Sequence, residues 1–117
     1  MALPSPSDLD SLQIGVTDAW RSFNVATVNG NRVRFRVMEN TTAKWHVHEN
    51  SDELFYVVSG TVLMDTERGV SKIQSRQLLV IPAGMRHRAR VEGRATLLVI
   101  DNIHGDEQPL PARNDAP

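Results

Sequence analysis

The sequence predicts an all-β fold, an antiparallel barrel or sandwich built from one chain of 117 residues. Eight or nine short apolar stretches follow one another, separated by turns rich in glycine, asparagine and proline. No segment of useful length has the 3.6-residue hydrophobic period of a helix. The length leaves room for one domain, and neither a P-loop nor a Rossmann glycine pattern is present.

Residues 1–24 are expected to form an N-terminal arm that is partly packed on the barrel. The arm begins with two prolines and two serines within its first seven residues, which favours a loose segment. Ser7 or Asp8 can cap one short helical turn directly after it. We expect Trp20 and Phe23 to pack against the barrel or a neighbouring subunit rather than to bind a ligand.

The barrel is expected to span residues 25–101 and to begin with a hairpin. Asn29-Gly30 supplies the two positive φ values of a type I′ turn. The return strand alternates, with Val33, Phe35 and Val37 on one face and Arg32, Arg34 and Arg36 on the other. We expect the arginine row, like Arg86, Arg88 and Arg90 further on, to form a solvated or salt-bridged outer face. In the alternative, Arg34 or Arg36 reaches into the barrel and pairs with a substrate carboxylate.

The other elements follow from short apolar runs and the turns between them. Strands are expected at 43–48 after a turn at 40–42, and then at 54–58, 61–65, 70–73, 78–81, 87–91 and 95–100. The run 78–81 is apolar throughout, which predicts a strand buried on both faces. Glu92-Gly93 predicts a turn between the last two strands. Residues 102–117 read as a polar C-terminal tail, ordered only if it docks on something.

Three histidines and one glutamate form the candidate site. His46 and His48 lie two residues apart on a strand, so both project from the same face. Glu53 stands at the mouth of the next strand, and His87 begins a strand after the turn at Pro82 and Gly84. This donor set suits Fe(II), Mn, Ni, Zn or Cu. Buried polar packing without a metal is the alternative, but it would leave a costly cluster uncompensated.

The same residues resemble the two motifs of the cupin superfamily. The run His46-x-His48-x4-Glu53-x6-Gly60 is similar to the first motif, and Pro82-x-Gly84-x2-His87 is similar to the second. The resemblance covers roughly residues 33–101 and is closest to small single-domain cupins. It implies a double-stranded β-helix, or jelly-roll barrel, in which His46, His48, Glu53 and His87 hold one divalent transition metal (Fe, Mn, Ni or Zn).

Three positions depart from the cupin motifs. Asn40 stands where the first motif begins with glycine, and asparagine tolerates the left-handed region almost as well. Arg76 replaces the opening glycine of the second motif, within a turn that is still polar. Val91 replaces its closing asparagine, which is not a ligand. All four ligand positions are therefore intact.

The resemblance implies a metal-dependent enzyme that acts on a small organic substrate. Dioxygenase chemistry is the first expectation, and isomerase or lyase chemistry is the second. Glu53 could also leave the metal and act as a catalytic base. The alternatives are a non-catalytic small-molecule-binding or sensor module, and a degenerate cupin whose function is its dimer. His104 fits no ligand spacing and is expected at the surface.

Composition excludes several other classes of function. A net charge of −1 favours neither nucleic acid nor an anionic membrane as a partner. The chain has no cysteine, which excludes disulfides and thiolate catalysis, and no apolar run of about twenty residues. Without a signal-peptide pattern, the expected location is cytoplasmic. Apolar residues on both faces of 78–81 and 97–100, with Trp45 turned outward, predict a homodimer.

Overall fold

The computed structural model describes residues 2–105 and the backbone of residues 107–109, and it confirms the all-β prediction. Every strand pair in it is antiparallel. In the described residues the elements are α1 Leu9–Gln13, β1 Trp20–Val28, β2 Asn31–Thr42, β3 His46–His48, β4 Glu53–Ser59, β5 Thr61–Thr66, β6 Gly69–Gln74, β7 Leu78–Ile81, β8 His87–Asn102 and β9 Glu107–Pro109.

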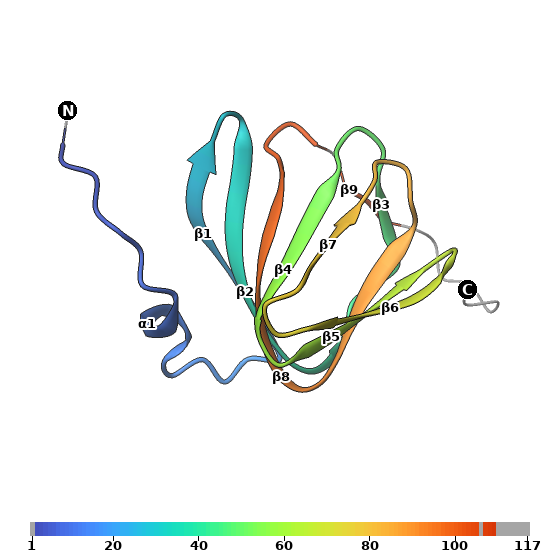
Figure 1. The fold of residues 1–117 in the computed structure, drawn as a ribbon, viewed down its shortest axis with the longest axis horizontal. Coiled ribbons are helices and arrows are strands. Elements are labelled where there is room, and N and C mark those ends of the chain that lie inside the picture. Colours follow the sequence, from blue (N-terminus) through green and yellow to red (C-terminus); the bar gives the residue numbers. More distant parts are fainter. Residues whose placement is uncertain (1, 106, 110–117) are drawn as a thin grey trace.

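Strand β8 is the centre of the barrel. Its first half pairs with β3 and β5, its second half pairs with β4, and β2 follows it along most of its length. The barrel therefore consists of two sheets that share β2 and β8 (Figure 1). The first sheet adds β1, β4 and β7, and the second sheet adds β3, β5, β6 and β9. This is the double-stranded arrangement that the sequence motifs imply.

The prediction of turns at 40–42 and 92–93 is wrong. Strands β2 and β8 each continue through these residues as one bent strand. Asn40 has φ 45° and Gly93 has φ 74°, so both backbones enter the left-handed region at the same corner. The Gly93 amide donates to the Asn40 side-chain Oδ1 over 2.7 Å, and the pairing register shifts there. A bulge of this kind bends a paired strand without ending it.

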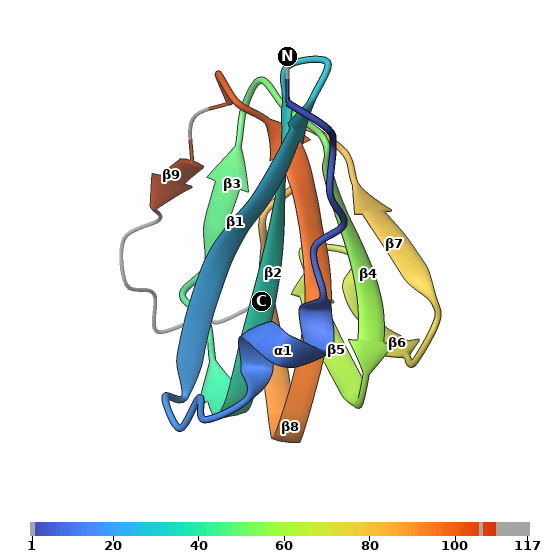
Figure 2. The same ribbon diagram turned by 90° about the vertical axis from the view of Figure 1, so that its left-hand side faces the viewer.

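The helix α1 lies against the outer face of the first sheet (Figure 2). Its N-cap is Asp8, as predicted, with the side chain accepting from the Asp10 amide. Leu9 and Leu12 pack there with a buried cluster formed by Val16, Phe35 and Val37. Strand β1 then starts at Trp20, earlier than the sequence predicts. No helix in the described residues is long and apolar enough to cross a membrane.

The arginine row of β2 faces the inside of the barrel, so its expected outward orientation is wrong. Arg32, Arg34 and Arg36 pair in register with Asp101, Val99 and Leu97 of β8. Leu97 and Val99 are completely buried in the interior core, which also holds Phe55, Val57 and Met64. The apolar row of β2 instead packs under α1. The alternation of apolar residues and arginines assigned the side chains of β2 to two faces correctly. It could not show which face is interior, because one face packs under α1 and the other faces the inside of the barrel.

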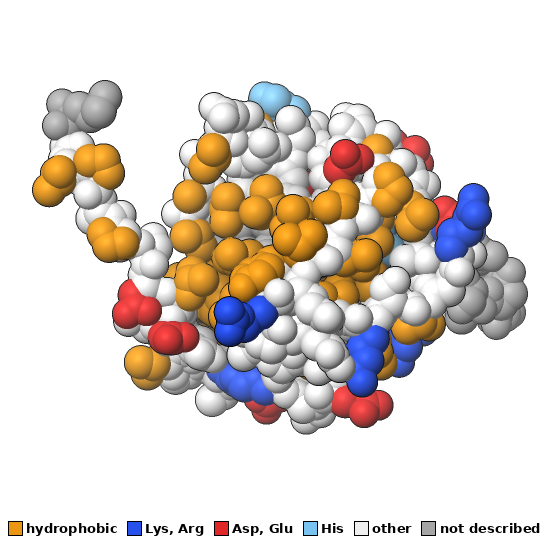
Figure 3. Space-filling view, viewed as in Figure 1, with side chains coloured by type: hydrophobic (Ala, Val, Ile, Leu, Met, Phe, Trp, Pro, Cys, Tyr) orange, Lys and Arg blue, Asp and Glu red, His pale blue; other side chains and the backbone are white. Residues whose placement is uncertain are grey.

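Strand β7 is not buried on both faces as expected. Among the described strands it pairs only with β4, and Leu78 and Val80 are 60% and 46% exposed. They extend two apolar rows across the outer face of the first sheet, Val33–Ile100–Leu54–Val80 and Phe35–Leu98–Tyr56–Leu78. Figure 3 shows hydrophobic side chains gathered across this face of the molecule.

Part of the predicted C-terminal tail forms strand β9. Its residues Glu107–Pro109 pair with all three residues of β3 (Figure 2). Residues 110–117 of the expected tail lie outside the described part of the chain. The short strand that carries two candidate ligands is therefore paired with β8 at one residue and with β9 at three.

Candidate metal centre

The candidate ligands come from three strand ends that the barrel brings together. His46 and His48 are the first and last residues of β3. Val47 between them points to the other face of the strand and is buried. His87 opens β8 and lies directly opposite His46 in the register of the two strands. Glu53 opens β4. The structure thus places all four predicted residues at one site.

The four donor atoms form a compact cluster around one carboxylate oxygen. Glu53 Oε1 is 2.8 Å from His87 Nε2, 3.3 Å from His48 Nε2 and 3.9 Å from His46 Nε2. All four donor atoms lie within 4.8 Å of one another. Ligands on opposite sides of an ion at about 2.1 Å each are about 4.2 Å apart. The cluster therefore needs only a small contraction to close on one ion.

Backbone carbonyls fix the tautomer of two of the histidines. His46 Nδ1 is 2.9 Å from the Lys44 carbonyl oxygen, and His87 Nδ1 is 2.9 Å from the Met85 carbonyl oxygen. A carbonyl can only accept, so each Nδ1 must carry the proton and donate. Each Nε2 then faces the cluster with a lone pair in the neutral ring, which is the arrangement of metal-ligating histidines.

Glu53 is ionised in this setting. Burial of its carboxyl would raise the pKa, but hydrogen bonds with His46, His48 and His87 outweigh that effect and hold the pKa far below its usual range. The Glu53 side chain is 3% exposed, as is that of His48, and that of His87 is 1% exposed. An Nε2 that donates a hydrogen bond to Glu53 carries a proton, and a divalent transition ion would take the place of those protons and bind the Nε2 lone pairs of neutral rings. The residues present therefore fit such an ion.

Arg34 contacts Glu53 of the metal cluster, and Asp101 in turn contacts Arg34. Arg34 Nη2 is 3.7 Å from Glu53 Oε2, the carboxylate oxygen turned away from the imidazoles, and 3.4 Å from Asp101 Oδ2. Asp101 is completely buried and also accepts two hydrogen bonds from Arg32, at 2.8 and 3.0 Å. The site predicted from the sequence did not include Asp101. Its signal was a lone carboxylate directly after the apolar strand 95–100, in phase with Leu97 and Val99.

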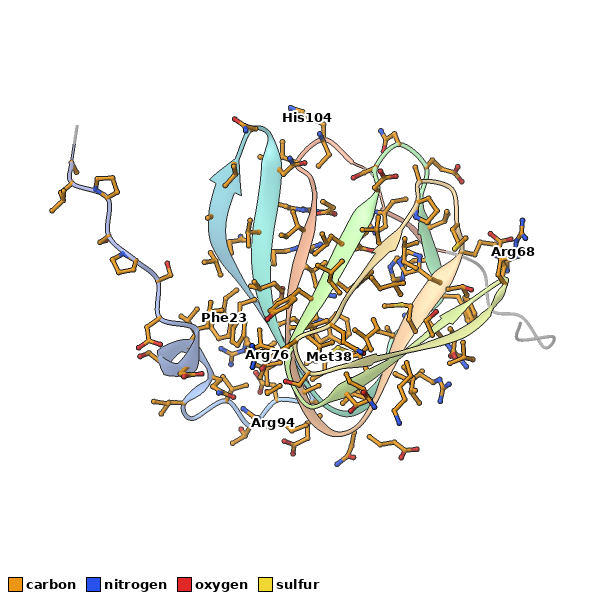
Figure 4. All side chains as sticks on the ribbon, in the orientation of Figure 1. Phe23, Met38, Arg68, Arg76, Arg94 and His104 are labelled. Atoms are coloured by element: carbon orange, nitrogen blue, oxygen red, sulfur yellow. The ribbon has the colours of Figure 1, made fainter. Side chains whose placement is uncertain are left out.

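A cavity of about 470 Å³ opens beside the cluster, with His46 and Glu53 in its wall. Trp45, expected to turn outward, also lines it, and Arg88 lies over its ring at 5.0 Å from the centroid. His104 is exposed, as predicted, and Figure 4 shows it at the rim of the molecule in the turn after β8. The site thus has room for a small molecule beside two of its four ligands.

The second arginine row does form a salt-bridged outer face, as the sequence predicts. Arg88 Nε donates to Asp65 Oδ2 over 2.7 Å, and Arg90 donates to both Asp65 oxygens over 2.6 and 2.8 Å. Asp65 comes from β5, the antiparallel neighbour of β8. This cluster lies on the side of β8 opposite His87 and takes no part in the metal centre.

Comparison with known families decides which family the chain belongs to. Residues 33–101 match the model of the cupin domain family Cupin_2, over more than half of the chain. The chain is a cupin. This cupin is 32% identical over 100 residues to the uncharacterized protein YdbB of Bacillus subtilis (strain 168), a match that covers 80% of this chain and 88% of that protein.

Solved structures of other proteins share the fold of this cupin. A protein with a double-stranded β-helix domain from Klebsiella pneumoniae superposes with a TM-score of 0.79 at 12% identity, covering 96% of this chain and all of that one. A cupin-2 domain containing protein from Shewanella frigidimarina superposes with a TM-score of 0.74 at 20% identity, covering 89% and 94%. At these identities the likeness shows the jelly-roll fold alone.

Proposed function

We propose that this cupin is a metal-dependent enzyme on a small organic substrate, with dioxygenase chemistry as the first candidate. The observation that carries the proposal is the convergence of three imidazole nitrogens and one carboxylate oxygen within 4.8 Å, beside a cavity of about 470 Å³. A cavity beside the donor atoms supports a site that admits a small molecule over a closed structural site.

The protein's own residues hold and orient the ion in this proposal. His46, His48 and His87 bind it through Nε2, and Glu53 binds it through Oε1. When bound, a divalent ion supplies Lewis-acid chemistry and, if it is redox-active, a site for oxygen activation. The Nδ1–H bonds of His46 and His87 to backbone carbonyls keep the rings from turning away.

Isomerase or lyase chemistry is the second candidate, and Glu53 is its catalytic residue. Among the described residues that line the cavity, Glu53 is the one carboxylate. It could leave the ion and take a proton from the substrate at Oε1 while Arg34 faces Oε2 at 3.7 Å. That shortage of acid–base groups also favours the alternative of a non-catalytic binding or sensor module, in which the same ion and cavity only capture a ligand.

The chain is also proposed to form a homodimer through the outer face of the first sheet. The two apolar rows described above cross four neighbouring strands, and the largest exposures are at its β7 edge. An apolar face of this extent is typical of an interface between copies. The arm of residues 2–8 leaves the body of the protein with every residue exposed (Figure 1).

Elemental analysis of the protein, purified without a histidine tag or chelator, is the first test. We expect about one transition metal per chain, and His46→Ala or His87→Ala should abolish it. His104→Ala is the matched control, because His104 is exposed and outside the cluster; it should keep the full metal content. Full metal in both ligand variants would refute the site.

Oxygen uptake by the iron-loaded protein then separates the candidate reactions. A panel of small diols, catechols and thiols should include a compound that drives oxygen consumption if the protein is a dioxygenase. Metal content without oxygen consumption would favour isomerase or lyase substrates and, if those are not turned over, the binding module. A protein that takes up no metal under any loading condition would contradict the enzyme and binding-module proposals, which depend on the ion.

A further inference from the structure

Two carboxylates lie side by side in the interior of the barrel. Glu53 of β4 and Asp101 of β8 are direct partners in the antiparallel register, so both side chains project from the same face of the sheet. The two residues are 3% and 2% exposed. Like charges directly opposite each other on neighbouring strands repel, and burial strengthens the repulsion. The pair is therefore stable only with a cation close to both of its members.

Arg34 of β2 is that cation. Its Nη2 lies 3.4 Å from Asp101 Oδ2 and 3.7 Å from Glu53 Oε2, and its side chain is 18% exposed. Asp101 is held in turn by two hydrogen bonds from Arg32, its register partner on β2. The guanidinium of Arg34 is thus anchored on a carboxylate that is itself fixed, and the same nitrogen faces Glu53.

The two oxygens of Glu53 have separate partners. Oε1 is the oxygen nearest to each of the three imidazoles, and Oε2 is the oxygen nearest to Arg34. When an ion takes the place of the Nε2 protons, Oε1 exchanges hydrogen bonds for the ion, but the contact of Oε2 with Arg34 does not depend on those protons. Without Arg34, Oε2 would be a buried carboxylate oxygen whose nearest cation is the ion.

We propose that Arg34 is a positioning residue that restricts Glu53 to one oxygen, Oε1, as a ligand of the ion. The inference rests on the proposed function, since it concerns the metal centre on which that function depends. A carboxylate can bind a metal ion through one oxygen or through both. Because Arg34 and Glu53 both line the cavity, holding Oε2 on Arg34 leaves the place that Oε2 would take on the ion to a small molecule from the cavity.

Infrared difference spectra between zinc-loaded and metal-free protein test the proposal without an activity measurement. The two C–O stretching bands of a carboxylate lie closer together when both oxygens bind an ion than when one oxygen does. The bands of Glu53 are assigned by their loss in Glu53→Gln. We expect Arg34→Met to bring these bands closer together than in the unaltered protein, because Oε2 turns to the zinc. Bands that stay in place or move apart in Arg34→Met would overturn the proposal.

Arg34→Lys separates the charge of Arg34 from its packing. Lysine keeps a cation beside Oε2 and should retain the band separation of the unaltered protein, whereas methionine keeps an unbranched side chain without the charge. Arg88→Gln is the matched control and should also retain the separation, because Arg88 pairs with another buried carboxylate, Asp65, away from the metal centre. Equal narrowing in Arg34→Lys and Arg34→Met, or narrowing in Arg88→Gln, would contradict the role of the Arg34 charge.

A crystal structure of the unaltered protein loaded with zinc covers the case in which Arg34→Met does not fold. Oε1 of Glu53 should bind the zinc, and Oε2 should remain in contact with Arg34. Zinc bound by both oxygens, or Arg34 turned away from Oε2, would overturn the proposal. Failure of the metal centre is distinguishable, because a protein that takes up no zinc gives no difference bands and refutes the proposed function as well, whereas zinc held by both oxygens refutes this inference alone.

Discussion

Glu53 presents its two carboxylate oxygens to different partners. Oε1 faces the three imidazoles, and Oε2 faces Arg34, which in turn contacts the buried Asp101. Arg32 joins Asp101 from the other side and is one-third exposed. A chain of alternating charges therefore runs from the surface to the metal centre and fixes which oxygen is available to an ion.

Asp101 is expected to be the most sensitive member of this chain. Asp101→Asn removes the buried carboxylate that Arg32 and Arg34 share, which should lower the free energy of unfolding by about 3 kcal/mol. Urea denaturation measures the change. Asp18→Asn is the matched control, because the Asp18–Arg21 pair is about half exposed, and it should cost no more than about 0.5 kcal/mol. Equal costs for both would contradict this account of Asp101.

Asp65 should make stability depend on pH below about 4. Hydrogen bonds from Arg90 lower its pKa, burial opposes them, and a further bond from Arg88 adds to the lowering. The folded protein thus favours the ionised form. The contribution is complete above the unfolded pKa of about 3.9 and is lost as pH falls from there toward the folded pKa.

Asp65→Asn isolates that contribution. At pH 7 the free energy of unfolding of the variant should be about 1–3 kcal/mol lower than that of the unaltered protein, because the variant lacks a carboxylate that is hydrogen-bonded to two guanidinium groups. The difference should shrink when urea denaturation is repeated at pH 3. A gap that stays constant from pH 7 to pH 3 would show that the Asp65 charge is not its source.

At the scale of elements, the turns at Gly60 and Arg76 both need a positive φ, which glycine adopts readily and arginine does not. Gly60 links β4 to β5 with φ 81°, and a Cβ there would lie 2.3 Å from the Arg94 carbonyl oxygen. Arg76, in the turn before β7, has φ 69° although it is not glycine, and its amide donates to the Val57 carbonyl over 2.7 Å. The departure from the cupin glycine therefore keeps the glycine conformation.

Substitutions at these turns should act in opposite directions. Arg76→Gly should raise the free energy of unfolding by about 1 kcal/mol by removing the left-handed strain of a residue with a Cβ. Gly60→Ala should lower it by more than that, because backbone atoms of β8 block the new methyl group. Thermal and urea unfolding of the two variants would check both signs, and a destabilised Arg76→Gly would contradict the strain argument.

The elements that could be predicted from sequence are those set by local patterns, whereas the four ligands follow from the resemblance to the cupin motifs. The Asn29-Gly30 hairpin, the Asp8 cap and the alternation of β2 depend on neighbouring residues. Whether the Arg34 row points into the barrel, and whether Leu78 is exposed, depends on which other elements pack on each face of the sheet. The period-two alternation of a strand separates its two faces but does not show what packs on them. The bends at Asn40 and Gly93 were taken for turns because a bulged corner and a turn use the same residue types.

At the scale of the whole molecule, the apolar outer face predicts the oligomeric state. Leu78→Lys places a charge at the β7 edge of the proposed interface, on its most exposed apolar residue, which is 60% exposed in one copy. It should convert a dimer to a monomer in light scattering after size exclusion. Val70→Lys is the control, with 61% exposure on β6, and it should leave the dimer intact. A monomeric unaltered protein would contradict the dimer proposal.

The pairing of β9 with β3 has a consequence for how the protein is handled. Strand β3 carries His46 and His48 and is held by β9 along its whole length, so a change near the C-terminus acts on the metal site through the backbone. An affinity handle rich in histidine at the C-terminus would follow β9 in the chain and could bring its own imidazoles to the ion. Purification handles for metal work therefore belong at the N-terminus, cleaved before any measurement.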